Sequence, residues 1–410
     1  MHRKRTISAA FGQGLRASPP KTKLATEGTG AGPQMVPSNG AKVAAFAFGL
    51  AALVAGCAFG PQAKTTGTVD DGLPHAFLYA GTNAGAIEIF EIDAATGSLI
   101  VRGKVGAGGT VAALAGLPFG RTLAALDDGT ATVITFDVEA GKGALHQTGR
   151  AATGGSRPGR IALDHSGKFV LVTHQASASV GVLAVKPAGG LATADLFPAG
   201  AGAYGIGFHP SNQVLFVANT KAGTLSQFSF SEGTGGLTPK PGAAVGLPWG
   251  SGPRGVVSHP SGHFIYVLNE SNSTVSVHSF DERMGTVTRL AFQVISTLPT
   301  ETGNKGRAVE IAVAVSGRFL YVINRGDDSI VTFAVDGETG SLTLVNRTPS
   351  GGAGAQALAL DPGGRFLVAA HQTSHHLSTF SLDPKTGVPT LGDNKKIGAA
   401  PLSAVIMRPR

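Results

Sequence analysis

Charged side chains stand at three places in the sequence where they could bind or react with a small molecule. Arg254 lies in "GPR", Glu270 ends the apolar stretch "HPSGHFIYVLNE", and Arg325 ends "SGRFLYVINR". Guanidinium and carboxylate groups that meet in one place can hold a polar ligand, or they can pair with each other as salt bridges. The elements that carry these residues decide between the two interpretations.

Polar pairs recur at the ends of short apolar strands along the whole chain. The pairs are Thr82-Asn83, Asp127-Asp128, His174-Gln175, Asn219-Thr220, Asn269-Glu270, Asn324-Arg325 and His371-Gln372. The first member of each pair is typical of a turn residue that bonds the backbone. The second members include Glu270 and Arg325, and we expect them to form a polar rim, with Gln372 in a supporting place.

A second set of equivalent positions precedes these strands. It comprises Gly159-Arg160, Tyr204-Gly205, Arg254-Gly255, Val309-Glu310 and Gln356-Ala357. We predict that these segments begin the innermost strands of a ring and line its channel, where ligands of ring-shaped folds bind. Arg160 and Glu310 fit a binding role and a salt bridge between repeats equally well, whereas a ligand role is favoured for Arg254, Glu270 and Arg325.

The pattern belongs to a sevenfold repeat. Copies begin at His75, Phe119, Ser166, Ser211, Ser261, Ser316 and Gly363, with steps of 45 to 55 residues between equivalent positions. Short strands at this period predict propeller blades. The first copy lacks its leading strand, and the C-terminal "IGAAPLSAVIMRP" supplies one. We therefore predict an all-β, seven-bladed β-propeller over 74–410, closed by the C-terminal strand.

Composition limits the partners. The net charge is +8, but residues 1–56 hold seven of the 33 Lys and Arg residues and one of the 25 acidic residues. The nearly neutral remainder gives no electrostatic reason to expect nucleic acid. "SHH" at 374–376 has no third ligand at a fixed spacing, so we expect no metal and no cofactor. A monomer is expected.

The N-terminal part predicts export. The sole cysteine, Cys57, follows the apolar run "VAAFAFGLAALVAG", and the segment Val54-Ala55-Gly56-Cys57 resembles a bacterial lipobox. We interpret 35–57 as a lipoprotein signal peptide with lipidation at Cys57, and 58–73 as a flexible tether. Residues 1–34 are either a misassigned start or a disordered extension. The expected location is the cell envelope, on the outer membrane or facing the periplasm; the alternative is an ordinary signal peptide with an incidental cysteine.

The stretches "GPR", "HPSGHFIYVLNE" and "SGRFLYVINRGDDSI", together with "VEI" at 309–311 and "DPGGRFLVAAHQ" at 361–372, resemble the propeller lactonase family. That family includes bacterial 6-phosphogluconolactonases of propeller type and carboxy-muconate lactonising enzymes. The resemblance implies a site at Arg254, Glu270 and Arg325, supported by Glu310, Gln372 and Arg160. In lactone opening, an arginine would stabilise the carbonyl oxygen, Glu270 would act as general base, and a second arginine would grip an anionic group.

Several histidines of the family pattern are replaced. Gly255, Ala312 and Asp327 stand where relatives have histidine, Tyr204-Gly205 replaces "PH", and Ala355-Gln356 replaces "PR". His174 or His371 could serve as proton shuttle instead.

Two functions remain open from the sequence. One is a lactonase-like hydrolase that acts on a small sugar lactone or anionic lactone. The other is a noncatalytic propeller, anchored in the envelope, that binds a protein, a glycan or a small metabolite. Convergence of Arg254, Glu270 and Arg325 in one open pocket would favour the first.

Overall fold

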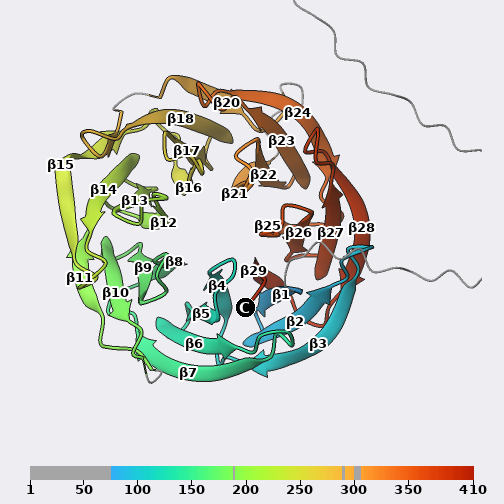
Figure 1. Cartoon of the computed structure of the whole chain (residues 1–410). Coiled ribbons are helices and arrows are strands. Elements are labelled where there is room, and N and C mark those ends of the chain that lie inside the picture. Colours follow the sequence, from blue (N-terminus) through green and yellow to red (C-terminus); the bar gives the residue numbers. More distant parts are fainter. Residues whose placement is uncertain (1–74, 188–189, 289–290, 300–305) are drawn as a thin grey trace, which may run out of the picture. The chain divides into compact units, whose positions relative to one another are not determined.

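The computed structural model describes residues 75–187, 190–288, 291–299 and 306–410. In these ranges every regular element is a β-strand, and seven antiparallel sheets form a ring (Figure 1). The predicted seven-bladed propeller is therefore confirmed. No helix in the described part of the chain is long and apolar enough to cross a membrane. The interpretations of 1–34, 35–57, Cys57 and 58–73 concern segments outside the described residues.

Each blade runs from an inner strand beside the central channel to an outer strand at the edge of the ring. From inside to outside, blade one consists of β29 (Pro401–Met407), β1 (Ala76–Thr82), β2 (Ala86–Ile92) and β3 (Leu99–Gly106). Blade two consists of β4 (Val111–Gly116), β5 (Thr122–Asp127), β6 (Thr132–Val138) and β7 (Leu145–Ala152). Blade three consists of β8 (Pro158–Leu163), β9 (Phe169–His174), β10 (Ser179–Ala184) and β11 (Asp195–Pro198). Blade four consists of β12 (Ala203–Phe208), β13 (Val214–Asn219), β14 (Thr224–Phe230) and β15 (Leu237–Gly246). Blade five consists of β16 (Pro253–Ser258), β17 (Phe264–Asn269) and β18 (Thr274–Asp281). Its outer edge is formed by β19 (Thr286–Val287) and β20 (Gln293–Ser296), which both pair with β18. Blades six and seven are β21 (Arg307–Val313), β22 (Phe319–Arg325), β23 (Ser329–Val335), β24 (Leu342–Pro349); and β25 (Ala355–Leu360), β26 (Phe366–His371), β27 (His376–Leu382), β28 (Pro389–Lys396).

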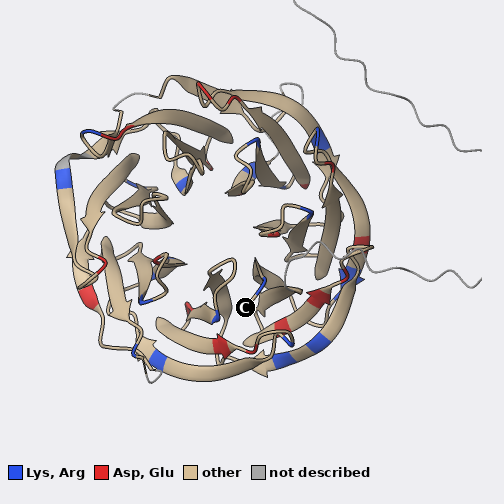
Figure 2. Cartoon of the chain, in the orientation of Figure 1, with Lys and Arg blue, Asp and Glu red and all other residues tan. Residues whose placement is uncertain are grey.

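The second strand of each blade forms the core. β17, for example, is buried along its whole length, because neighbouring blades cover both faces of its sheet. This explains why such strands read as continuous apolar runs rather than as alternating ones. The outer strands are largely exposed, as in β3, and charged residues lie mainly on them and on the loops (Figure 2).

A repeated contact joins one blade to the next. The first phenylalanine of a second strand packs on the turn glycine that follows the third strand of the next blade, as Phe264 does on Gly340. Gly340 has φ +72°, and a Cβ added there would lie 2.3 Å from the Phe264 ring. The Tyr266 hydroxyl donates a hydrogen bond to the Gly340 carbonyl. These turns therefore require glycine, which accounts for the Thr-Gly pair that recurs there, as at Thr96-Gly97, Thr339-Gly340 and Thr386-Gly387.

The C-terminal strand closes the ring. β29 pairs with β1, with Leu78 opposite Ile406, so the predicted closure is confirmed. Just after β29, Arg408 donates two hydrogen bonds to the carboxylate of Asp361 in blade seven, at 2.7 and 3.0 Å. Both side chains are almost fully buried. This ion pair ties blade one to blade seven.

Candidate functional site at the channel mouth

A β-bulge begins the inner strand of every blade. In blade five, Pro253 pairs with Asn269 and Gly255 with Leu268, so Arg254 is an extra residue in the ladder. Tyr204 and Gln356 are the extra residues of blades four and seven. A bulge re-aims a side chain beside a functional site. The bulges lie where the second strands end, at the end of the channel that we call the channel mouth.

Two glycines let blade four approach Arg254 closely. A Cβ added at Gly205 would lie 2.4 Å from the Arg254 carbonyl oxygen, and one at Gly207 would lie 2.6 Å from the Val256 carbonyl oxygen. The sequence "YGIGF" therefore brings the backbone of β12 against that of β16. Tyr204, at the start of this segment, is carried next to Arg254.

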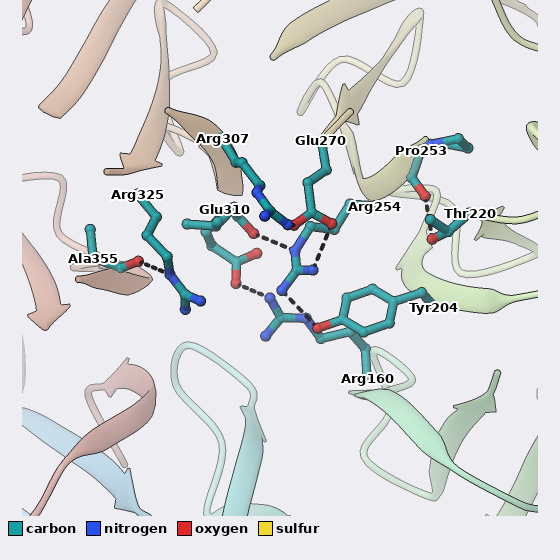
Figure 3. Close-up of polar contacts among 11 residues, drawn as sticks. Arg160, Tyr204, Thr220, Pro253, Arg254, Glu270, Arg307, Glu310, Arg325 and Ala355 are labelled. Atoms are coloured by element: carbon teal, nitrogen blue, oxygen red, sulfur yellow. Dashed lines mark hydrogen bonds and ion pairs between the residues drawn. The ribbon is translucent and has the colours of Figure 1, made fainter. Parts of the chain in front are cut away.

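Arg254 is held by three contacts (Figure 3). Its guanidinium donates hydrogen bonds to the Glu270 carboxylate at 2.9 Å, to the Val309 carbonyl at 3.1 Å and to the Tyr204 hydroxyl at 2.9 Å. The side chain is only 15% exposed and Glu270 only 21%. Partners from three blades thus fix one cation at the channel mouth, and partial burial strengthens its field.

A second ion pair crosses the channel. Arg160 of blade three donates to the Glu310 carboxylate of blade six at 2.6 Å. The Tyr204 ring lies between the two arginines, 5.5 Å from the Arg160 guanidinium carbon and 4.6 Å from that of Arg254. Burial opposes the charged form, but the nearby Glu310 carboxylate outweighs it and raises the pKa of Arg160. Arg160 and Glu310 therefore form a salt bridge between blades, one of the two arrangements expected from the sequence. Both side chains also line the channel, as the other arrangement, a binding role, requires.

Arg325 has a different environment. It donates to the Ala355 carbonyl at 3.0 Å and to the Gln372 side-chain oxygen at 3.4 Å, and no described carboxylate forms an ion pair with it. Burial, together with the nearby positive charge of Arg254, lowers its pKa from the ordinary value. A guanidinium with only neutral partners favours an added anion. Arg307 lies close by, 3.9 Å from Glu270, and is largely exposed (Figure 3).

Two adjoining cavities occupy the channel. One, of about 220 Å³, is lined by residues of all seven inner strands, among them Arg160, Arg254 and Glu310. The other, of about 340 Å³, is lined by Gln372 and Tyr204 with residues from the opposite side of the mouth. Neither Glu270 nor Arg325 is among the residues that line these cavities; Glu270 bonds Arg254 and Arg325 bonds Gln372, which do line them. The described residues contain no group of three or more His, Cys, Asp or Glu side chains placed to hold a metal ion.

The structure places Arg254 in contact with Glu270 and Arg160 in contact with Glu310, but Arg254, Glu270 and Arg325 do not line one common pocket. Two further expectations need correction. His174 and His371 are fully buried and point into their blades, where they bond Ser179 and Ser350. Burial lowers the pKa of both. They line neither cavity, so the prediction of a proton shuttle at the rim is wrong. The physical reason is that the first member of each strand-end pair is buried and its side chain points away from the channel mouth. Tyr204 and Arg307 were not chosen from the sequence, although the bulge alignment already placed Tyr204 in line with Arg254.

The fold and the site define a seven-bladed propeller with an arginine–carboxylate cluster at the mouth of its central channel. A family model described as "Lactonase, 7-bladed beta-propeller" matches residues 77–405, and the chain belongs to that family. The chain resembles the structure of a periplasmic gluconolactonase of Pseudomonas aeruginosa, with 26% identity, a TM-score of 0.74, and coverage of 81% of this chain and 99% of that one. A putative 6-phosphogluconolactonase of Bacteroides fragilis shares the fold, with 20% identity, a TM-score of 0.74, and 83% and 99% coverage.

A curated relative is similar over a short segment only. The 6-phosphogluconolactonase of Bacillus subtilis is 37% identical over 70 residues, which is 17% of this chain and 20% of that protein. The match therefore spans about a fifth of the relative's length.

Proposed function

We propose that the protein is a lactonase that opens the ring of a small sugar lactone or anionic lactone at the channel mouth. The observation that carries the proposal is the pairing of Arg254 with Glu270 beside Arg325, a cation without a carboxylate partner among the described residues. Family membership and the similarity to a gluconolactonase structure support it.

The contacts suggest how the residues would act. Glu270 Oε2 accepts from Arg254. Within the described part of the chain, the one charged group paired with Glu270 Oε1 is the exposed Arg307 at 3.9 Å, so Oε1 is available to a water molecule. Glu270 would take a proton from that water as oxygen adds to the lactone carbonyl carbon. Arg254 would stabilise the resulting oxyanion. The ring C–O bond then breaks, and the proton passes to the leaving alkoxide, which gives a hydroxy acid.

Hydrolysis of glucono-1,5-lactone and its 6-phosphate by the purified protein tests this proposal. We expect a rate above the spontaneous one, a loss of about 10²–10³-fold in kcat for Arg254→Ala and of about 10²–10⁴-fold for Glu270→Gln. Glu338→Gln changes an exposed glutamate in a turn of blade six and serves as matched control. A wild-type rate equal to background, with all variants folded, would favour the ligand-binding propeller without catalysis.

We also propose that the protein is exported and lipidated at Cys57. The lipobox-like sequence supports this, and the similar Pseudomonas protein is described as periplasmic. Export would favour an unphosphorylated lactone, since phosphorylated sugar lactones arise inside the cell. Growth with a labelled fatty acid should label the wild type and leave Cys57→Ala unlabelled; label on neither protein would contradict lipidation.

A further inference from the structure

The channel mouth is divided into two chemically different halves. Blades four to six supply the charged cluster around Arg254 (Figure 3). The other half, from blades seven, one, two and three, borders the cavity of about 340 Å³. There the bulge residues of blades seven, one and two are Gln356, Leu402 and Ala112, which carry no charge. The bulge of blade three holds Gly159 and Arg160, and the charge of Arg160 is paired with Glu310. Among the described residues that line this cavity, the exposed Arg157 is the one arginine and Asp128 is the one acid.

Three side-chain amides surround this cavity. They belong to Gln175, Gln356 and Gln372. Those of Gln175 and Gln356 make no hydrogen bond to other described residues, and the Gln356 Oε1 atom is buried without a partner. A buried acceptor without a partner destabilises the empty site. Rotation of that amide toward a hydroxyl group in the cavity would satisfy it.

The backbone holds Gln175 at the wall of the cavity at a conformational cost. Arg157 has φ +54°, a left-handed conformation that is uncommon for a residue other than glycine. In this conformation its carbonyl accepts a hydrogen bond from the Gln175 backbone N–H at 2.8 Å. Strain of this kind concentrates at ligand sites. The geometry thus fixes an unpaired amide beside the cavity.

Tyr204 connects the two halves. Its hydroxyl accepts a hydrogen bond from Arg254, and Tyr204 also lines the amide-rich cavity. With Leu402, it adds apolar surface beside the amide groups of the cavity wall. Amides that can both donate and accept suit adjacent hydroxyls, and an apolar patch suits the C–H face of a sugar.

We propose that this amide-lined half is a subsite for the hydroxylated part of the substrate, so that the protein selects polyhydroxylated acyl groups over plain aliphatic ones. The inference rests on the proposed function for the placement of the carboxyl end, which faces Arg254 and Arg325. Gln175, Gln356 and Gln372 then bond the hydroxyls, and the two halves together set the orientation of the ligand in the channel.

Equilibrium binding of two six-carbon acids tests the subsite without requiring catalysis. Gluconate carries hydroxyl groups along its chain, and hexanoate carries none. Thermal-shift titrations of the full chain should give a Kd for gluconate at least about 10-fold below that for hexanoate. Gln175→Met and Gln356→Met, which keep the side-chain length, should each weaken gluconate by about 3- to 10-fold and shift hexanoate by less than about twofold. Gln147→Met, on the exposed β7 strand, should change neither Kd.

The outcomes separate this inference from the proposed function. Equal affinities for the two acids, tighter binding of hexanoate, no binding of either acid, or an unchanged gluconate preference in both glutamine variants would each overturn the subsite. Absence of lactone hydrolysis would overturn the proposed function instead, and it would leave a gluconate preference that depends on Gln175 and Gln356 intact.

Discussion

Replacing Glu310 by glutamine breaks the ion pair that crosses the channel. Arg160 Nη2 lies 2.6 Å from Glu310 Oε2. Opposite unit charges separated by about 4 Å attract each other by about 4 kcal/mol at an effective dielectric constant of 20. The two side chains are 23% and 17% exposed, so water screens part of this attraction. We expect the free energy of unfolding to fall by about 2–3 kcal/mol, because Arg160 remains partly buried without its partner. For a domain of roughly 330 residues, this lowers Tm by about 3–4 °C.

The same substitution should strengthen anion binding. Arg160, Arg254, Arg307 and Arg325 now face the carboxylates of Glu270 and Glu310, and Glu310→Gln removes one of those two negative charges. Because Arg160 loses its carboxylate, orthophosphate should bind the variant about 5- to 10-fold more tightly than the wild type. Saturating phosphate should therefore restore part of the lost Tm.

Thermal unfolding in low-salt buffer, with and without phosphate, measures both effects. Glu338→Gln, which removes an exposed carboxylate from a turn, is the control for net charge. A double variant, Arg160→Met with Glu310→Met, should recover stability and lose the added phosphate response, since both charges are removed together. A Glu310→Gln protein with the wild-type Tm and the wild-type phosphate response would refute the reasoning.

Three further predictions concern the fold. Arg408→Met should lower the free energy of unfolding by about 3–5 kcal/mol, since it leaves Asp361 charged and buried; a guanidinium midpoint equal to that of the wild type would contradict the role of this pair in ring closure. Gly340→Ala should cost about 2–4 kcal/mol through its positive φ and its overlap with Phe264, again by chemical denaturation, whereas Gly337→Ala, which meets no neighbour, should cost far less. Stability should fall as the pH is lowered from 7 to 5.5, because burial lowers the pKa of five histidines below the ordinary 6.5 and the unfolded chain then binds more protons; a urea midpoint that stays constant or rises over this range would exclude the effect. The five are His174, His209, His259, His278 and His371.

The repeat made the fold predictable from the sequence. Equivalent positions such as Leu78 and Leu320 recur because each blade buries the same strand between the same two neighbours. Ring closure followed from one missing strand at the start and one extra strand at the end. The alignment also marked the bulge positions, since Arg254 and Gln356 stand at the same place in their blades.

The partners within the site were not predictable in the same way. Arg160 and Glu310 are 150 residues apart in the sequence, and their contact depends on which blades face each other across the channel. The repeat period predicts the backbone position of each residue in its blade. The contact between Arg160 and Glu310 also depends on the length and rotamer of both side chains and on the width of the channel. Tyr204 shows the limit most clearly, because the alignment placed it at the position equivalent to Arg254 but gave no sign that its hydroxyl accepts a hydrogen bond from Arg254.

The packing at the channel mouth explains why positions that hold histidine in the family pattern hold other residues in this chain. At Gly255, a Cβ would lie 2.9 Å from Ile311 Cγ2 and 3.4 Å from Leu268 Cβ, so a histidine there would require Ile311 to move. At Gly205, which stands where the family pattern has histidine, a Cβ would lie 2.4 Å from the Arg254 carbonyl oxygen, so the backbone of blade five would have to move. The preceding Tyr204, in the place of the family proline, accepts from Arg254 through its hydroxyl and lies against Arg160 through its ring. No histidine is among the described residues that line either channel cavity. A lactone-opening reaction at this mouth would therefore use a carboxylate and water for its proton transfers, which is the role proposed above for Glu270.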